Sequence, residues 1–375
     1  MTAPPEILIS AGEASGDMYA ARLARALQAL TGAHLFGMGG PKMREAGVEI
    51  VADASEIAVV GITEALHRLP AVWRAWRKLE QEAVHRKPAL AITVDSPGFN
   101  FGLARRLKKH GIRIVYFISP QIWAWRPRRM RWIQRRFERV LVIFPFEEEI
   151  YRKAGVAVNF VGHPLVDSVH PQTTREQFAA RFGLNAQHPM VALLPGSRPS
   201  EIRRSMPIIA EACAQLQKNF PVQFVLVVAP GLDAHIFDCF KRMDLHVTSV
   251  IDAVYDALPA ADCAIVSSGT ATVEAALLGT PMVVVYRLSG LTAMIARPLV
   301  RTPLFAMVNL ISGRQVVPEL IQNRFTAEAL EREIRRLLDS PEARAQQRQD
   351  LAAVRLKLGP GGAIERAAEV IAGML

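Results

Sequence analysis

Cysteine is scarce in this chain, and metal-binding motifs are missing from it. Cys213, Cys239 and Cys263 are the three cysteines among 375 residues, and no two of them stand in a C-x-x-C spacing. This odd, scattered set argues against a disulfide framework or a thiolate zinc site and predicts buried, reduced thiols. No D-x-D pair, His/Cys cluster or H-E-x-x-H motif occurs either, so we expect no metal site and no bound cofactor.

Long apolar runs are also missing. Proline, glycine or a charged residue interrupts every apolar stretch before it reaches the length of a bilayer-spanning helix. The first residues, MTAPPEILISAGEASGD, lack both the basic and the continuous apolar region of a signal peptide. The sequence therefore predicts a cytoplasmic protein.

Acidic residues are too few to balance the basic ones. The chain has 45 Lys and Arg against 35 Asp and Glu, a formal net charge of +10. This surplus indicates an anionic partner, which is a nucleic acid, an anionic membrane surface or a phosphorylated substrate.

What is present is a regular alternation of short apolar runs with helical patterns. The runs are EILIS, ALAITVD, IRIVYFIS and RVLVIF in the first half and MVALLP, VQFVLVVA, DCAIVSS and PMVVVYR in the second. Continuously apolar strands separated by helices predict parallel sheets covered on both faces, which is the α/β class.

A stretch rich in His, Pro and small polar residues, 160–174, separates the two sets of strands. We place the domain boundary near 162–169 and expect two Rossmann-like domains, 1–165 and 166–345, with a cleft between them. Residues 346–375 read as helices that break at 359–362 and pack back on the first domain.

In an open parallel sheet, ligands bind beyond the carboxyl ends of the strands. The first such end, ISAGEASGD, offers Glu13, Ser15 and Gly16 at the start of a helix, where backbone amides attract anions. It does not match G-x-G-x-x-G, and no acidic residue follows the second strand at HLFGMGG, so NAD is disfavoured. A plain glycine turn with Asp17 as a helix cap is the alternative.

A second candidate end is VDSPGFN, with Asp95 and Asn100. A carboxylate at the tip of a strand can accept a proton from an attacking hydroxyl group once water is excluded. The alternative is an aspartate that only caps the following helix.

The second half has two strand-to-helix turns with small hydrogen-bond donors. LLPGSRPSEIRR contains Gly196, Ser197 and Arg198 but lacks the ending of a Walker motif, so ATP hydrolysis is not indicated. SSGTATVEAALLGTP offers Ser268, Gly269 and Thr270, with Glu274 one turn further on. Two helix N-termini of this kind predict a diphosphate site, with Glu274 accepting hydrogen bonds from a ribose.

A late stretch, VNLISGRQVVPELIQ, reads as a polar, glycine-broken loop leading into a helix. It contributes a set of candidate substrate-binding residues, Asn309, Arg314, Gln315, Glu319 and Gln322. Turn chemistry explains Gly313 and Pro318 but hardly the full set.

Two stretches combine aromatic and apolar residues with cationic charge. The first, 56–79, resembles an interfacial amphipathic segment whose candidate membrane residues are Val59, Val60, Leu66, Leu69, Val72, Trp73 and Trp76. The second, 119–139, interleaves seven arginines with Trp123, Trp125 and Trp132, which suits nucleic acid and a lipid surface equally. A core-facing helix for the first and a solvated helix face for the second are the alternatives.

Seven stretches in this order, AGEASGD, DSPGFN, SPQIWAWR, VGHPLVD, LLPGSR, SSGTATVE and NLISGRQVVPELIQ, make the sequence similar to the lipid-A-disaccharide synthase family. The resemblance runs from Ile9 to about Gln322. It implies a GT-B glycosyltransferase fold with the nucleotide held mainly by the second domain. It also places the family's critical aspartate, arginine and asparagine on Asp95, Arg198 and Asn309.

The resemblance further implies the reaction. The family transfers 2,3-diacylglucosamine from its UDP derivative to the 6-hydroxyl of 2,3-diacylglucosamine 1-phosphate, inverting the anomeric carbon and releasing UDP. UDP is thus a leaving group rather than a cofactor. Because both substrates are acylated, the resemblance implies a peripheral protein on the cytoplasmic face of the inner membrane. The oligomeric state stays open, with a homodimer as one option.

These observations lead to a mechanistic hypothesis. Asp95 is the general base for the acceptor hydroxyl, and Arg198 together with the turn at Ser268 neutralises the departing UDP. The rivals are another GT-B enzyme, such as a different UDP-sugar transferase or an epimerase, and a basic nucleic-acid-binding protein.

Overall fold

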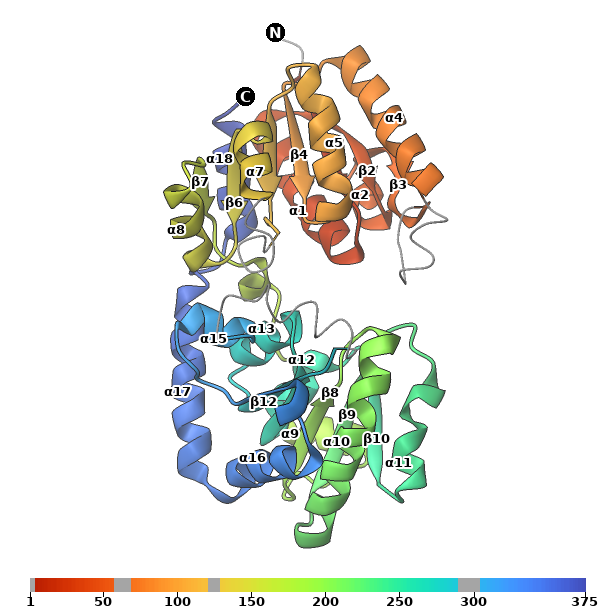
Figure 1. The fold of residues 1–375 in the computed structure, drawn as a ribbon, viewed down its shortest axis with the longest axis vertical. Helices are drawn as coiled ribbons and strands as arrows, with labels where there is room; N and C mark the ends of the chain where they lie inside the picture. The colour runs from red at the N-terminus through yellow and green to blue at the C-terminus, as the bar shows by residue number, and fades with distance from the viewer. Residues whose placement is uncertain (1–3, 57–68, 121–128, 289–303) are drawn as a thin grey trace. The chain divides into compact units, whose positions relative to one another are not determined.

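The computed structural model describes residues 4–56, 69–120, 129–288 and 304–375. The chain divides into two compact units, the first comprising 1–164 together with 358–375 and the second comprising 165–357. Each unit is built on one parallel sheet with helices on both faces (Figure 1). The predicted α/β class with two Rossmann-like halves is confirmed.

The first unit contains a seven-stranded sheet in the order β3-β2-β1-β4-β5-β6-β7. Its strands are β1 (Glu6–Ala11), β2 (His34–Gly39), β3 (Glu49–Asp53), β4 (Leu90–Val94), β5 (Ile114–Phe117), β6 (Arg139–Val142) and β7 (Val158–Phe160). Its helices are α1 (Ala14–Thr31), α2 (Pro41–Glu45), α4 (Leu69–Arg86), α5 (Pro97–Lys109), α7 (Met130–Arg136), α8 (Pro145–Lys153) and α18 (Ala363–Ala372), with a 3₁₀ turn η1 (Ala54–Glu56).

Side chains alternate between the two faces of this sheet, so that each face buries its own core. One face packs against α4, α5, α7 and α8, and the other is covered by α1 and α18. Two arginine side chains also bond this C-terminal part to the unit through backbone carbonyls. Arg366 Nη2, on α18, donates to Val161 O at 2.7 Å, and Arg113 Nη1 donates to Met374 O, just after α18, at 2.6 Å. The C-terminal segment 346–375 thus spans the end of α17 in the second unit and α18 in the first.

The second unit contains a six-stranded sheet in the order β10-β9-β8-β11-β12-β13. Its strands are β8 (Met190–Leu194), β9 (Gln223–Val228), β10 (Val247–Ile251), β11 (Cys263–Ser267), β12 (Met282–Tyr286) and β13 (Glu319–Ile321). Its helices are α9 (Arg175–Phe182), α10 (Pro199–Asn219), α11 (Asp238–Arg242), α12 (Val254–Ala260), α13 (Thr270–Leu277), α15 (Met307–Ser312), α16 (Ala327–Asp339) and α17 (Pro341–Lys357), with 3₁₀ turns η3 (Pro164–Asp167), η4 (Ala234–Phe237) and η5 (Gln322–Arg324).

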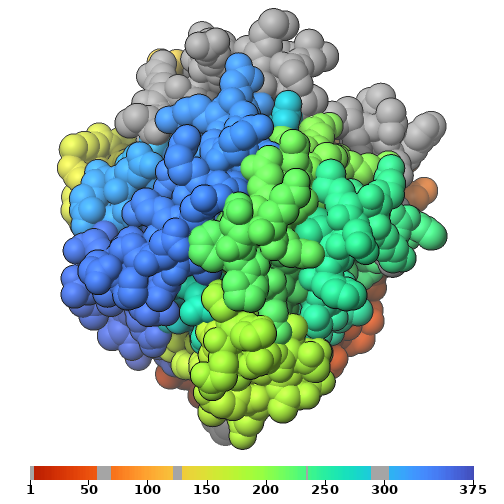
Figure 2. Space-filling model, turned by 90° about the horizontal axis from the view of Figure 1, so that it is seen from below, coloured from red at the N-terminus to blue at the C-terminus, as the bar shows by residue number. Residues whose placement is uncertain are grey.

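Helices α10, α11 and α16 pack on one face of this sheet around a core that includes Ile202, Ile209 and Leu330. Figure 2 shows their outer surfaces side by side, with α10 in green between the blue α16 segment and the teal α11 segment. Helices α9, α12, α13, α15 and α17 form the remaining layer. This arrangement leaves the carboxyl ends of the strands open for ligand-binding turns.

The four strands that the sequence did not predict, β3, β7, β10 and β13, are the four edge strands of the two sheets. They have three to five residues each. An edge strand has one neighbour and is partly exposed, so it lacks the continuous apolar run that revealed the central strands.

The cysteines are free in the structure. Cys213 and Cys263 are completely buried, and burial raises the pKa of both thiols; Cys239 is half-buried. The expectation of buried thiols is confirmed for the first two, whereas Cys239 is partly accessible. Within the described ranges, no helix combines the length and apolarity needed to cross a membrane.

Candidate functional site

In the first sheet the strand order reverses between β1 and β4, and such a reversal is where open α/β sheets bind ligands. The two strands are paired up to Ala11 and Val94, so Glu13 and Asp95 leave the sheet side by side. Gly12 N donates to Ser96 Oγ at 3.2 Å, and a Cβ at Gly12 would lie only 2.9 Å from that oxygen. Glycine at this position therefore permits the close approach of the two turns.

Asp95 has an unusual backbone conformation. Its φ is +46° and that of Ser96 is +45°, so two consecutive residues other than glycine occupy the left-handed region. The carbonyl oxygen of Asp95 accepts hydrogen bonds from Tyr116 Oη and Asn100 Nδ2, both at 2.7 Å. Backbone strain of this kind persists where surrounding contacts enforce it, and it concentrates at functional sites.

The side chain of Asn100 holds this turn through hydrogen bonds to its backbone. It is fully buried, its Nδ2 donates to the carbonyl oxygens of Val94 and Asp95, and its Oδ1 accepts from Ser10 Oγ at 2.9 Å. Predicted as a substrate-binding residue, Asn100 directs its side chain to the protein backbone in this structure. It positions Asp95.

The carboxyl group of Asp95 has a raised pKa of about 6. The main cause is burial, and the nearby negative charge of Glu13 adds to it, while a hydrogen bond from the backbone of Ser96 opposes it. A base with this pKa is deprotonated at neutral pH and still accepts a proton readily. Asp95 thus has the properties that a general base requires.

The remaining candidates near β1 lie at the start of α1. Glu13 is its N-cap, Ser15 is exposed in the first turn, and Gly16 is buried. Asp17 accepts hydrogen bonds from the amides of Gly40, Lys42 and Met43 at 2.7–3.2 Å, and so caps the separate helix α2. The alternative of Asp17 as a cap is correct, although the helix that it caps is not its own.

In the second sheet the order reverses between β8 and β11, so the two predicted turns stand at this reversal. Gly196 faces Ser267, since a Cβ at Gly196 would lie 3.4 Å from Ser267 Oγ, and its φ of +116° is a conformation that favours glycine. Neither α10 nor α13 has a side-chain cap at its N-terminus. The positive ends of both helix dipoles are thus available to an anion.

Arg198 is the N-cap residue of α10, and its side chain is 74% exposed. Its Nη1 donates to Glu201 Oε1 at 3.1 Å. The negative charge of Glu201 also raises the pKa of Tyr286, at the end of β12, after the larger effect of burial. Sequence reasoning missed both residues, although an acidic residue in the first turn of a helix and a tyrosine at a strand end are recognisable signals.

Glu274 lies in α13 and is largely buried. Tyr255 Oη donates to Glu274 Oε1 at 3.1 Å, and burial raises the pKa of the carboxyl group against the effect of that hydrogen bond. Tyr255 is a further residue that the sequence did not single out. It orients Glu274 while leaving the second carboxylate oxygen to accept another donor.

The prediction of a single loop for the late stretch is wrong. In the structure this stretch is a helix, a turn and a strand, namely α15, residues 313–318 and β13. Asn309 is fully buried, its Nδ2 donates to Val317 O and Glu319 Oε1, and its Oδ1 accepts from the amides of Val316 and Val317. Glu319 also accepts from the amides of Phe305 and Ala306. These two side chains hold the segment together, since a buried amide and carboxylate need such partners.

The other candidates in this stretch are accessible. Arg314 pairs with Asp350 at 2.6 Å, Gln315 is exposed, and Gln322 has a φ of +54° directly after β13. The five residues therefore do not form one polar cluster. Asn309 and Glu319 form a buried pair, and the other three lie at the surface.

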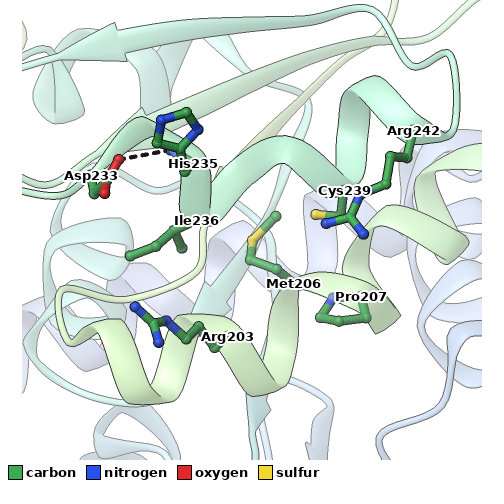
Figure 3. Close-up of a pocket in the computed structure, with 8 residues that line it drawn as sticks. All are labelled: Arg203, Met206, Pro207, Asp233, His235, Ile236, Cys239 and Arg242. Atoms are coloured by element: carbon green, nitrogen blue, oxygen red, sulfur yellow. Dashed lines mark hydrogen bonds between the residues drawn. The ribbon is translucent and has the colours of Figure 1, made fainter.

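A hollow of about 300 Å³ lies between α10 and the segment from Asp233 to Arg242 (Figure 3), and no residue of the turns at Gly196 and Ser268 lines it. Its floor is apolar, with Met206, Pro207, Ile236 and Cys239. Arg203 and Arg242 lie at opposite ends of it in Figure 3, so their cationic groups do not converge on one point.

The predicted membrane segment is described only from Leu69 onward, since Val59, Val60 and Leu66 lie outside the described residues. On α4, Leu69 and Trp73 are 58% and 49% exposed. Val72 and Trp76 instead pack against the core, where Trp76 Nε1 donates to Phe99 O at 3.1 Å and its ring lies against Gly102. The helix thus presents only part of the predicted set to its surroundings.

Helix α7, which is separated from α4 by α5, carries the described part of the arginine-rich stretch. Trp132 is exposed, and the guanidinium groups of Arg129 and Arg136 lie 5.5 Å and 5.1 Å from the centre of its ring. Arg77 lies 5.4 Å from the ring of Trp73 in the same way. Trp123 and Trp125 lie outside the described residues.

The family model described as Lipid-A-disaccharide synthetase matches residues 7–371. The chain belongs to this family. The lipid-A-disaccharide synthase of Geobacter sulfurreducens is 45% identical over 372 residues, which cover 98% of this chain and 97% of the relative. That of Myxococcus xanthus is 43% identical and covers 100% and 99%.

Membership of the lipid-A-disaccharide synthase family makes the protein a glycosyltransferase of lipid A biosynthesis, with a sugar nucleotide and a lipid acceptor as substrate classes. Membership of this family argues against the alternative of a nucleic-acid-binding protein.

In the described part of the chain, no three His, Cys, Asp or Glu side chains are grouped so as to hold a metal ion.

Solved structures show the fold. The UDP-GlcNAc 2-epimerase of Neisseria meningitidis bound to UDP-GlcNAc has a TM-score of 0.69 at 12% identity, over 98% of this chain and 99% of that one. CalG4, the calicheamicin glycosyltransferase, has a TM-score of 0.61 at 16% identity, over 100% and 99%. The predicted GT-B fold is confirmed.

Proposed function

We propose that this glycosyltransferase moves a 2,3-diacylglucosamine unit from UDP to the 6-hydroxyl of 2,3-diacylglucosamine 1-phosphate. The observation that supports it is the placement of complementary chemistry at the two strand-order reversals. The first holds the buried carboxyl group of Asp95, with a pKa of about 6, and the second holds two uncapped helix N-termini beside Arg198. A base for an acceptor and a site for a diphosphate leaving group are the two requirements of sugar transfer from UDP.

In the proposed mechanism, the oxygen of the acceptor 6-hydroxyl attacks the anomeric carbon of the donor sugar. The Asp95 carboxylate takes the proton of this hydroxyl at the same time. The bond from that carbon to the diphosphate oxygen breaks, and its electron pair leaves with UDP. Because attack and departure occur on opposite faces of one carbon, a single displacement inverts the configuration and forms a β-1,6 link.

The charge that develops on the leaving diphosphate has several partners in this proposal. Arg198 supplies a permanent positive charge in a planar fork, and Ser197, Ser268, Gly269 and Thr270 supply hydroxyl and backbone donors. Glu274, oriented by Tyr255, accepts hydrogen bonds from the ribose. The donors act on charge that is greatest after the bond has broken, so they stabilise the transition state more than the bound substrate.

This charge compensation leads us to propose that the reaction needs no resident metal ion. Purified protein treated with EDTA and incubated with both acylated substrates is expected to form the disaccharide 1-phosphate and UDP, detected by mass spectrometry. Its rate should lie within about twofold of the rate with added Mg²⁺. Product that appears only with the metal would refute this part, and no product under either condition would refute the proposed reaction.

We also propose that the protein docks on the cytoplasmic face of the inner membrane through a lipid-facing patch, defined as Leu69, Trp73 and Trp132 with Arg77, Arg129 and Arg136. Indole rings favour the headgroup layer, and the arginines stacked on them pair with lipid phosphates. The formal charge of +10 favours the same anionic surface.

Replacing Leu69 and Trp73 together with serine tests the patch. We expect binding to vesicles of phosphatidylglycerol and phosphatidylethanolamine to fall about tenfold or more in a sedimentation assay, because two exposed apolar side chains are lost. Leu30→Ser is the matched control, since Leu30 is 55% exposed but lies on α1, across the sheet. Equal binding by the double variant and the control would assign these residues to another role.

A further inference from the structure

Glu201 is a carboxylate placed where the proposed diphosphate would bind. It lies in the first turn of α10, with its side chain only 18% exposed, and its Oε1 accepts from Arg198 at 3.1 Å. Its Oε2 would lie 3.7 Å from a Cβ added at Gly196, so the carboxylate is adjacent to the glycine turn. The carboxylate therefore occupies the neighbourhood of an anion-binding helix N-terminus.

A second polar side chain lies near Glu201 on another strand. It belongs to the half-buried Tyr286, at the end of β12. Burial raises the pKa of Tyr286, and the negative charge of the nearby Glu201 raises it further. The Tyr286 ring packs on Phe305 with the ring centres 5.0 Å apart. Glu201 thus lies between a cation that it binds, Arg198, and the hydroxyl group of Tyr286.

This geometry has two opposing consequences for a diphosphate. The carboxylate keeps the exposed guanidinium of Arg198 near the turn, which reduces the freedom that binding must restrict. Its negative charge also competes with the diphosphate for Arg198 and for the helix N-terminus, and like charges at such distances repel.

We propose that Glu201 is a positioning residue that holds Arg198 ready in the empty site and limits the affinity for UDP, so that the product leaves after transfer. This inference rests on the proposed function, because it assigns the same turn to UDP. No covalent step is involved. The carboxylate acts through its charge and its hydrogen bond to Arg198.

Glu201→Gln removes the charge and keeps the shape, since its amide oxygen can still accept the hydrogen bond from Arg198. We expect the Kd of UDP, measured by calorimetry, to fall on the order of 10-fold. In steady-state assays, the inhibition constant of UDP should fall with it and kcat should decrease, because product release slows. Tighter binding with lower turnover is a result that damage to the fold does not produce.

Two controls accompany this variant. Glu211→Gln removes the same charge from an exposed position on the same helix and should leave the Kd of UDP unchanged. Tyr286→Phe keeps the ring against Phe305 and leaves Glu201 charged, so its Kd should stay within about threefold of the original.

The outcomes are distinguishable. A Glu201→Gln variant that binds UDP as the original does, or more weakly, would overturn the role of Glu201 while the proposed function stands. Unaltered protein that binds neither UDP nor inorganic pyrophosphate would overturn the proposed function, and this inference with it.

Discussion

Replacing Asp95 with asparagine is expected to lower kcat by about 10²-fold or more while leaving the Kd of UDP nearly unchanged. The amide cannot accept the proton of the acceptor hydroxyl, whereas the proposed UDP site lies on other strands. Asparagine is the appropriate replacement because it tolerates the φ of +46° at this position, which alanine does not. Rates with saturating substrates and UDP calorimetry provide the measurement.

The same variant should be more stable than the original protein at neutral pH. The native pKa of Asp95, about 6, exceeds the ordinary value of 3.8, so the native state binds more protons than the unfolded state between those values. Stability therefore falls as pH rises through this window, and at pH 7 the buried carboxylate costs up to about 3 kcal/mol. In urea unfolding, the free energy of unfolding of Asp95→Asn should exceed that of the original protein at pH 7. Near pH 4 the two values should be nearly equal.

The pH profile gives an independent test. Activity should decline as pH falls through about 6, because the base becomes protonated. Glu13→Gln removes the neighbouring charge that raises this pKa, so the acidic limb of the profile should move to lower pH. Near-normal turnover in Asp95→Asn, or an acidic limb that persists in that variant, would remove Asp95 from its role as base.

Replacing Arg198 with alanine is expected to weaken UDP binding by about 10²-fold and to lower kcat/KM by about 10²- to 10³-fold. The guanidinium is the permanent charge at the diphosphate turn, and the leaving group is most negative once the bond breaks. Because the side chain is 74% exposed and its ion pair with Glu201 lies at the surface, Tm should change little. Arg198→Lys should be intermediate, since it keeps the charge but loses the planar fork.

The matched control is Lys218→Ala, which removes an exposed cation from the last turn of the same helix. It should bind UDP as the original does, and so show that the effect is local rather than due to net charge. If Arg198→Ala and Lys218→Ala bind UDP equally well, the diphosphate does not use the turn at Gly196.

The sequence predicted the central strands because they are buried on both faces. Runs such as Ile7–Ile9 and Val283–Val285 are continuously apolar, and no alternative element explains them as well. It also predicted Asp95, Gly196 and Ser268 as site candidates, since they directly follow such runs. It did not predict the edge strands, and it joined α15 and β13 into one loop, because short, partly exposed elements carry no clear periodicity.

The sequence also could not predict the direction in which each polar side chain points. Asn100 and Asn309 stand in stretches that the family resemblance marks as functional, yet both amides bond to backbone groups of their own unit. Glu201 and Tyr286 are 85 positions apart, and nothing local connects them. Their contact exists because β12 lies beside β11, which is next to β8, in the sheet.

By itself, the sequence determined the α/β class, the positions of the ligand-binding turns and the family, because burial and turn chemistry are local properties of the chain. The tertiary structure decided which of those turns meet and which polar side chains remain free to bind. Strand order brings Glu13 to Asp95 and Ser267 to Gly196. The raised pKa of Asp95 follows from that packing, since the burial and the neighbouring charge that cause it come from distant parts of the chain.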